Sequence, residues 1–278
     1  VENLDAVESM EVTETGPLRA TVTVERRFDD SFIRQQIRLC AGSPRIDFVT
    51  HVDWQERKRF LKAAFPVAVH NDKATYEIQY GSVERPTHTN TSWDLARFEV
   101  PAQRWADLSE GDYGVAVLND CKYGYDIQDS VLRLSLLRGP EHPDPSADLG
   151  EHDFTYALYP HVGNHREGGV IEEATRLNQP PQLQSLPEDQ SGERPARQSW
   201  VEVLRPGFYL TTLKMAEREE ALILRGYEGW GTRGPLRLRL QALDPAEVWL
   251  ADLMEAPVAQ LDLHDGEVTL PLKPFEIV

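Results

Sequence analysis

The sequence of 278 residues lacks a long apolar segment and an excess of basic charge. No stretch of about 18 apolar residues occurs, so no segment is expected to span a bilayer as a helix. A basic segment followed by an apolar one, the pattern of a signal peptide, is also missing from these residues. With 29 basic and 46 acidic residues the net charge is −17. This charge disfavours nucleic acid and anionic membranes as partners.

Cysteine is scarce as well. The two cysteines, Cys40 and Cys121, have no CxxC or CxH spacing, so a structural zinc site is not expected. Their scarcity favours a reducing, cytoplasmic setting. The GxSxG motif of serine hydrolases and a GxGxxG motif between a strand and a helix are both missing, so these two enzyme classes lack support.

What the chain does have is alternation of period two. Leu18, Ala20, Val22 and Val24 alternate with polar residues, which predicts a half-buried strand with these four side chains on its apolar face. In the next run Ile37 and Leu39 flank Arg38, and after a turn at Gly42-Ser43-Pro44 the run from residue 46 to 54 alternates in the same way. These last two runs predict a hairpin.

Similar strands are expected along the rest of the chain. Pro66 places the strand within residues 60–69 at a sheet edge. The only helical candidates, residues 92–96 and 214–220, are too short to be stable alone. The fold class is therefore predicted to be all-β, with long loops on a large sandwich.

Residues 178–197 contain four prolines and no aromatic residue, which predicts a mobile surface connection. We therefore expect a large β domain over residues 1–180, a Pro-rich connection over 181–198, and further strands over 199–278. These last strands form a smaller sandwich or complete the large one. The chain begins at Val1, and its final strand pattern stops at Val278, so we expect a piece of a longer polypeptide.

One loop concentrates carboxylates: Asp144, Asp148, Glu151 and Asp153. Two carboxylates about 5–9.5 Å apart perform glycoside hydrolysis, but a solvated acidic loop is an equally simple interpretation. The run does not follow the calcium-loop pattern.

His161 and His165 have H-x3-H spacing, yet Pro160 and Gly163 argue against the helix that would bring both rings to one face. We expect His161 to end a strand and bond nearby backbone.

Aromatic residues lie among polar ones in the loops, namely Trp93, Trp105, Tyr113, Tyr123 and Tyr125. An aromatic face beside Asp or Asn suits a sugar ring, whereas core packing explains the tryptophans equally well. Lys122 either reaches a substrate hydroxyl or pairs with Asp120 or Asp126.

Three long blocks resemble the carboxy-terminal region of class II alpha-mannosidases, glycoside hydrolase family 38, of the cytosolic and vacuolar type. They are VDWQERKRFLKAAFPV (52–67), YGSVERPTHTNTSWDLARFEVPAQRWADLSEGDYGVAVLNDCKYGYD (80–126) and LSLLRGPEHPDPSADLGEHDFTYALYPH (134–161). The resemblance implies a β-supersandwich similar to galactose mutarotase, followed by a smaller β-sandwich. It also implies hydrolysis of alpha-linked mannose with retention, by a zinc ion and an aspartate nucleophile in a separate amino-terminal part.

The resemblance implies that the partners of this chain are the catalytic and helical domains of the same polypeptide and mannose-containing glycans. It leaves open whether the intact protein forms a homo-oligomer. No catalytic residue and no zinc ligand is expected in these 278 residues. The residues expected to face substrate are His88, Asn90, Trp93, Asp94, Asp120, Lys122, Tyr123, Asp144, Asp148 and His152. The alternative is an independent carbohydrate-binding or mutarotase-like module, with His161 as acid and Glu151 as base.

Overall fold

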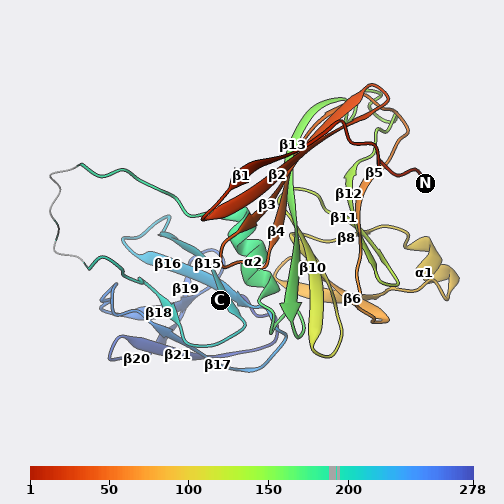
Figure 1. The fold of residues 1–278 in the computed structure, drawn as a ribbon. Coiled ribbons are helices and arrows are strands. Elements are labelled where there is room, and N and C mark those ends of the chain that lie inside the picture. Colours follow the sequence, from red (N-terminus) through yellow and green to blue (C-terminus); the bar gives the residue numbers. More distant parts are fainter. Residues whose placement is uncertain (188–191, 193–194) are drawn as a thin grey trace. The chain divides into compact units, whose positions relative to one another are not determined.

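The computed structural model describes residues 1–187, 192 and 195–278. Nearly all of its regular structure is β, which confirms the predicted fold class (Figure 1). The chain divides into two compact units, Val1–Ile78 with Val83–Pro181, and Gln79–Ser82 with Gln182–Val278. Part of the expected Pro-rich connection, residues 188–191 and 193–194, lies outside the described residues.

Two antiparallel sheets form the first unit. The larger has nine strands in the order β1 (Ser9–Thr15), β2 (Arg19–Phe28), β3 (Ser31–Cys40), β4 (Ile46–Trp54), β13 (Gly150–Val162), β10 (Tyr113–Asn119), β9 (Trp105–Ser109), β6 (Lys73–Ile78) and β7 (Gly81–Pro86). The smaller has four, in the order β5 (Leu61–Pro66), β12 (Val131–Leu137), β11 (Gly124–Gln128) and β8 (Val100–Pro101). β5 is an edge strand, as Pro66 predicted.

The core of this unit lies between its two sheets. Val52 and Trp54 of β4 are at most 1% exposed, and they share one hydrophobic cluster with Leu132 and Leu134 of β12. The alternation predicted for residues 46–54 is confirmed, because Thr50, Val52 and Trp54 are the buried residues of β4. The hairpin of β3 and β4 is also confirmed by their antiparallel register.

The expected apolar face of β2 is fully buried only at Val24, which is 1% exposed. Thr21 and Thr23 are 4% and 5% exposed, whereas Leu18, just before β2, is 79% exposed. Polar partners from β1 cover the threonines, since Thr21 donates to Glu14 at 2.8 Å and Thr23 lies 2.9 Å from the hydroxyl of Thr13. Strand alternation therefore predicted the two faces of β2 correctly, but apart from Val24 the polar face is the more buried one.

Two short helices accompany the sheets, α1 (Ser92–Ala96) and α2 (Val170–Asn178). The sequence reasoning named the first and missed the second. α2 packs on β9 and β10 through Val170, Ile171 and Ala174, and Arg45 of the β3–β4 turn bonds Glu173 beside them.

The second unit contains three smaller sheets. A four-stranded sheet has the order β14 (Glu202–Val203), β17 (Gly234–Arg239), β21 (Glu267–Leu272) and β20 (Leu263–His264). Two hairpins complete it, β15 (Phe208–Met215) with β16 (Leu222–Glu228), and β18 (Val248–Ala251) with β19 (Pro257–Leu261). The predicted alternation is confirmed by Leu236 and Leu238 of β17 and by Val268 and Leu270 of β21, all at most 7% exposed. Residues 214–220 form the end of β15 and a turn, not a helix.

Candidate functional site

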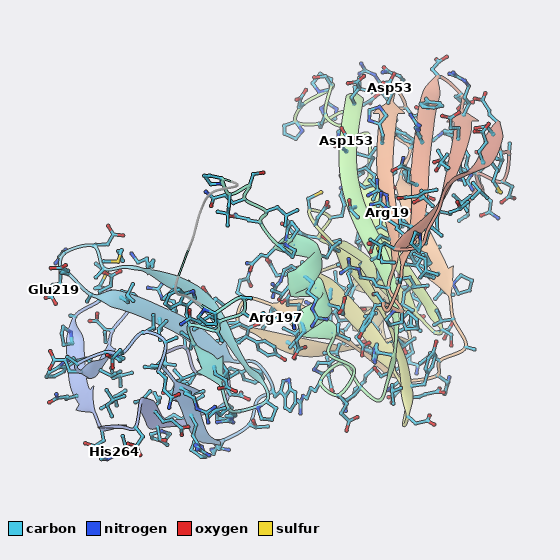
Figure 2. The ribbon with its side chains drawn as sticks, turned by 60° about the vertical axis from the view of Figure 1, so that its left-hand side comes forward. Arg19, Asp53, Asp153, Arg197, Glu219 and His264 are labelled. Carbon is cyan, nitrogen blue, oxygen red and sulfur yellow. The ribbon has the colours of Figure 1, made fainter. Side chains whose placement is uncertain are left out.

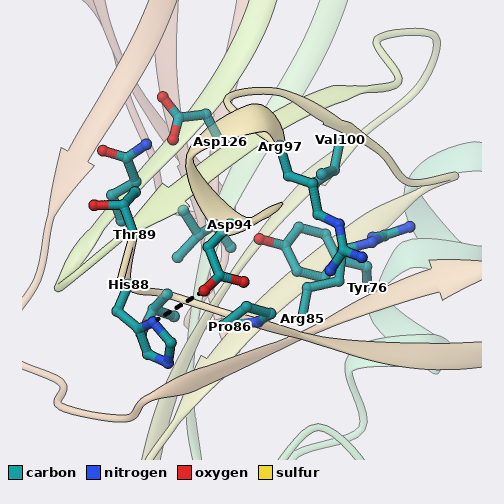
Figure 3. Close-up of a pocket in the computed structure, with 12 residues that line it drawn as sticks. Tyr76, Arg85, Pro86, His88, Thr89, Asp94, Arg97, Val100 and Asp126 are labelled. Carbon is teal, nitrogen blue, oxygen red and sulfur yellow. Dashed lines mark ion pairs between the residues drawn. The ribbon is translucent and has the colours of Figure 1, made fainter. Parts of the chain in front are cut away.

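A pocket of the first unit collects part of the polar block at residues 85–97 (Figure 3). β7 supplies Arg85, the following loop supplies His88, and α1 supplies Asp94. Tyr76 of β6 and Asp126 of β11 complete the walls from two other strands. The pocket is therefore built where four elements of the first unit meet, and residues distant in sequence contribute to it.

Helix α1 is held in place by its own first turn. The Thr91 hydroxyl donates to the Asp94 carboxylate at 2.7 Å. It also accepts a hydrogen bond from the backbone N–H of Asp94 at 3.2 Å, and the Asp94 carboxylate in turn accepts the backbone N–H of Thr91 at 3.2 Å. This reciprocal capping box fixes a helix of only five residues. The bonds from Thr91, followed by the nearby His88, lower the pKa of Asp94. The His88 Nδ1 atom lies 3.7 Å from the same carboxylate, so the two residues approach each other without a hydrogen bond.

Arg85 occupies the inner part of the pocket. Its guanidinium carbon lies 4.6 Å from the centre of the Tyr76 ring, a cation–π distance. Burial lowers the pKa of Arg85, and Arg97 lowers it further. Burial also raises the pKa of the Tyr76 hydroxyl, so this tyrosine is neutral at physiological pH. Neither Arg85 nor Arg97 was predicted as a site residue from the sequence. The contact between Arg85 and Tyr76 joins two different strands, so no local sequence pattern indicates it.

Trp93 of α1 is 77% exposed and is not among the residues that line the pocket, although it precedes the lining residue Asp94. Asn90 lies in the loop before α1, and its backbone N–H reaches toward His88 Nδ1 at 3.4 Å. Trp93 is thus no core residue. Trp105, in contrast, is 0% exposed and is part of the interior, as the packing alternative held.

Asp120, Lys122 and Tyr123 lie instead in the connection between β10 and β11. Asp120 accepts the backbone N–H of Thr155 at 2.8 Å. Lys122 makes neither of its predicted pairings among the described residues: its Nζ lies 4.5 Å from the ring of Phe154. The cations near Asp126 are instead Lys62 at 3.7 Å and Arg133 at 3.5 Å. Tyr123 is 51% exposed.

Asp144, Asp148 and His152 lie in the connection from β12 and at the start of β13. Their polar groups are used locally: Asp144 accepts from Ser146, Asp148 accepts the backbone N–H groups of Arg138 and Gly139, and His152 contacts the carbonyl of Asp148. Asp153 pairs with His51 of β4 at 2.9 Å, near Asp53 at the same end of the sheet (Figure 2). The geometry thus favours a structured acidic loop over an acid–nucleophile pair.

The ten candidates therefore fall in three places, and no hydrogen bond or ion pair made by the described residues joins one place to another. Whether any of the ten faces a substrate stays a prediction. Within residues 1–187, 192 and 195–278, no three His, Cys, Asp or Glu side chains are close enough together to hold a metal ion. The described residues accordingly do not fit the zinc ion that the resemblance implies.

A second polar cluster lies beneath α2. His161 of β13 is in its strand, but its Nε2 bonds the Asp107 carboxylate of β9 at 2.7 Å, with both side chains at most 2% exposed. The expected backbone bond is present as well, since Nδ1 lies 3.5 Å from the Val162 carbonyl, and the Asp107 carboxylate is an additional partner. The other Asp107 oxygen bonds Ser109, so serine contacts the acid and not the imidazole. This is not the order in which a serine nucleophile is activated.

The mutarotase alternative loses its two residues on geometry. Glu151 and His161 lie in one strand, β13, ten positions apart. A strand rises about 3.3 Å per residue, which places them about 33 Å apart. They cannot converge on one anomeric carbon.

Comparisons with known proteins decide the family. Residues 1–146 match the domain described as glycosyl hydrolases family 38 C-terminal domain, and residues 207–278 match the family 38 C-terminal beta sandwich domain. The chain belongs to glycosyl hydrolase family 38. It is 46% identical over 256 residues to human alpha-mannosidase 2C1, and 52% identical over 120 residues to an alpha-mannosidase of Saccharomyces cerevisiae. The resemblance drawn from the three sequence blocks is confirmed.

The family 38 chain is shorter than its relatives. The match to the human protein covers 90% of this chain and 24% of the relative; the yeast match covers 43% and 11%. A solved alpha-mannosidase structure from Enterococcus faecalis V583 shares its fold with a TM-score of 0.82 at 18% identity, covering 97% of this chain and 34% of that one. No helix of the described residues is long and apolar enough to cross a membrane.

Proposed function

We propose that this family 38 chain is the β-sandwich region of a zinc-dependent, retaining alpha-mannosidase of the cytoplasm, and that it supports a catalytic part elsewhere in the polypeptide. Three observations support the proposal. The chain corresponds to about a quarter of human alpha-mannosidase 2C1. Its described residues provide no zinc site, so the metal and the nucleophile are assigned to the remainder. Both cysteines are unpaired, which suits a reducing compartment.

The surface proposed to receive the catalytic part is an uncovered stretch of the nine-stranded sheet. We call it the β1–β3 apolar face, and it consists of Met10, Val12, Ala20, Val22, Ile37 and Leu39. Residues directly paired across strands share a face. Val12 pairs with Val22, and Val22 pairs with Ile37. The same line of paired residues continues across the sheet to Phe48 and Tyr156, which pack in the core.

The core itself stops short of this face. The cluster between the two sheets includes no residue of β1, and Met10 and Val12 are 63% and 66% exposed. An apolar strip that continues a core face is typical of an interface. Because the matched relatives are about four times longer, the occupant we propose is the rest of the same polypeptide.

Replacing Val12 with lysine tests this support role. In the full-length polypeptide, Val12→Lys buries an unpaired charge, and we expect the thermal midpoint to fall by about 4 °C. In the 278-residue chain alone the same position is open to water, so the midpoint stays unchanged. Glu11→Lys, on the other face of β1, is the control and should leave both proteins unaltered.

Activity provides the second half of that test. The full-length polypeptide with zinc should hydrolyse an aryl alpha-mannoside, and the chain alone should not. Hydrolysis by the chain alone, or an equal effect of Val12→Lys in both proteins, contradicts the proposal.

We further propose that the exposed Trp93 contacts the glycan. An aromatic side chain that is 77% exposed, next in sequence to the pocket residue Asp94, suits the C–H face of a sugar ring. In the full-length enzyme, Trp93→Ala should raise KM about tenfold with little change in kcat, because binding is lost equally from the ground and transition states. Phe98→Ala, a second exposed aromatic after α1, serves as control. Unchanged KM in Trp93→Ala contradicts this role.

A further inference from the structure

Two arginines line the Arg85 pocket. Among the described residues no acid forms an ion pair with Arg85, whereas Asp94 lies near enough to Arg97 for that arginine to lower the pKa of Asp94. The Nη1 atom of Arg85 is buried without a hydrogen-bond partner. Arg97 follows α1 and lies near enough to lower the pKa of Arg85. Figure 3 shows both side chains beside the Tyr76 ring. A buried guanidinium next to a second one is unfavourable unless an anion joins them.

The carboxylates of the pocket are engaged elsewhere. Asp94 is bonded by Thr91 in the capping box. Asp126 lies 3.7 Å from Lys62 and 3.5 Å from Arg133. Asp94 therefore offsets part of the charge of Arg97, and it is Arg85 that has no ion-pair partner among the described residues, although the chain as a whole carries a net charge of −17.

We propose that this pocket binds an oxyanion, a carboxylate or a phosphate, through Arg85 and Arg97. A guanidinium presents parallel N–H donors that match two oxygens of such a group. A neutral sugar hydroxyl accepts a hydrogen bond but cannot compensate two positive charges. The site goes beyond the proposed hydrolase role, since it requires no bond cleavage. The anion is either a free ligand or an acidic side chain from the rest of the polypeptide.

Calorimetric titration with inorganic phosphate and with acetate tests the site in the 278-residue chain. We expect saturable binding of at least one of the two anions. Arg85→Gln should weaken this binding at least about tenfold. Arg85→Lys should weaken it less, because lysine keeps the positive charge but lacks the paired N–H donors of the guanidinium. Arg97→Gln is a second variant at an exposed position. It tests the same site if Arg85→Gln fails to fold. Arg138→Gln, an exposed arginine of the β12–β13 connection, is the matched control and should bind as the parent does.

Repeating the titration with the full-length polypeptide identifies the source of the anion. Retained binding assigns the pocket to a free ligand, and lost binding assigns it to a carboxylate of the polypeptide itself. Absence of binding to the chain alone overturns the proposal, and so does binding that both folded variants, Arg85→Gln and Arg97→Gln, leave unchanged. Anion binding is measured without mannoside hydrolysis. Failure of this proposal can therefore be distinguished from failure of the proposed function.

Discussion

Replacing Glu228 with alanine is expected to lower the free energy of unfolding of the second unit by about 4 kcal/mol. The side chain is 0% exposed at the end of β16. Its carboxylate accepts the backbone N–H groups of Trp230 at 3.2 Å, Thr232 at 3.0 Å and Phe275 at 3.1 Å, and the Thr232 hydroxyl at 2.8 Å. Arg205 lies 3.9 Å away. Alanine would leave three backbone N–H donors, one hydroxyl donor and one cation without this partner.

Urea denaturation followed by tryptophan fluorescence measures the effect, since Trp230 adjoins the carboxylate. Glu228→Gln keeps the shape but turns an N–H₂ group toward backbone donors, so we expect an intermediate loss of about 2 kcal/mol. Glu220→Ala, in the exposed turn before β16, is the control and should leave the midpoint unchanged. If Glu228→Ala unfolds at the same urea concentration as this control, the carboxylate does not organise the unit.

The sequence predicted the fold class because its strands carry the period of two locally. β4, β17 and β21 each bury alternate residues as their patterns indicated. The burial of β2 could not be predicted in the same way. A face of β2 is covered only where the opposing sheet extends over it. The width of that sheet depends on pairing between strands that are distant in the sequence. The result is a pair of buried threonines on one face and an open apolar strip on the other.

Helix α2 could have been predicted from its sequence pattern. Val170, Ile171 and Ala174 follow helical spacing, with Glu172 in the first turn and Arg176 in the last. Nine residues is short for an isolated helix, so its stability comes from packing on β9 and β10.

The candidate site was predictable only as a set of polar loops. The block at residues 85–97 indicated a working surface, and His88 and Asp94 do line the pocket. The position of Arg85 depends on Tyr76, which another strand supplies. Likewise, His161 finds its partner Asp107 through the register that sets β13 beside β10 and β10 beside β9. Contacts set by sheet register leave no local pattern in the sequence.

Lowering the pH from 8 to 5 is expected to cost the first unit about 2 kcal/mol of unfolding free energy through His165 alone. Burial lowers the pKa of His165 to about 4, and its ring stacks on Trp105 with 5.2 Å between centroids. Its Nε2 atom is buried without a hydrogen-bond partner. Among nearby charges, Asp107 and Glu84 favour protonation, while Arg166 and His161 oppose it.

The direction follows from which state binds the proton. An unfolded histidine takes up a proton near pH 6.5, but the folded chain resists until about pH 4. Stability is therefore complete above pH 6.5 and decreases as the pH falls toward 4. His165→Phe keeps the stack and cannot titrate, so its urea midpoint should fall less than that of the parent between pH 8 and 5. His70→Gln, an exposed histidine, should follow the parent. Parallel pH profiles for His165→Phe and the parent would show that His165 is protonated in the fold without cost, and that the space beneath α2 admits water.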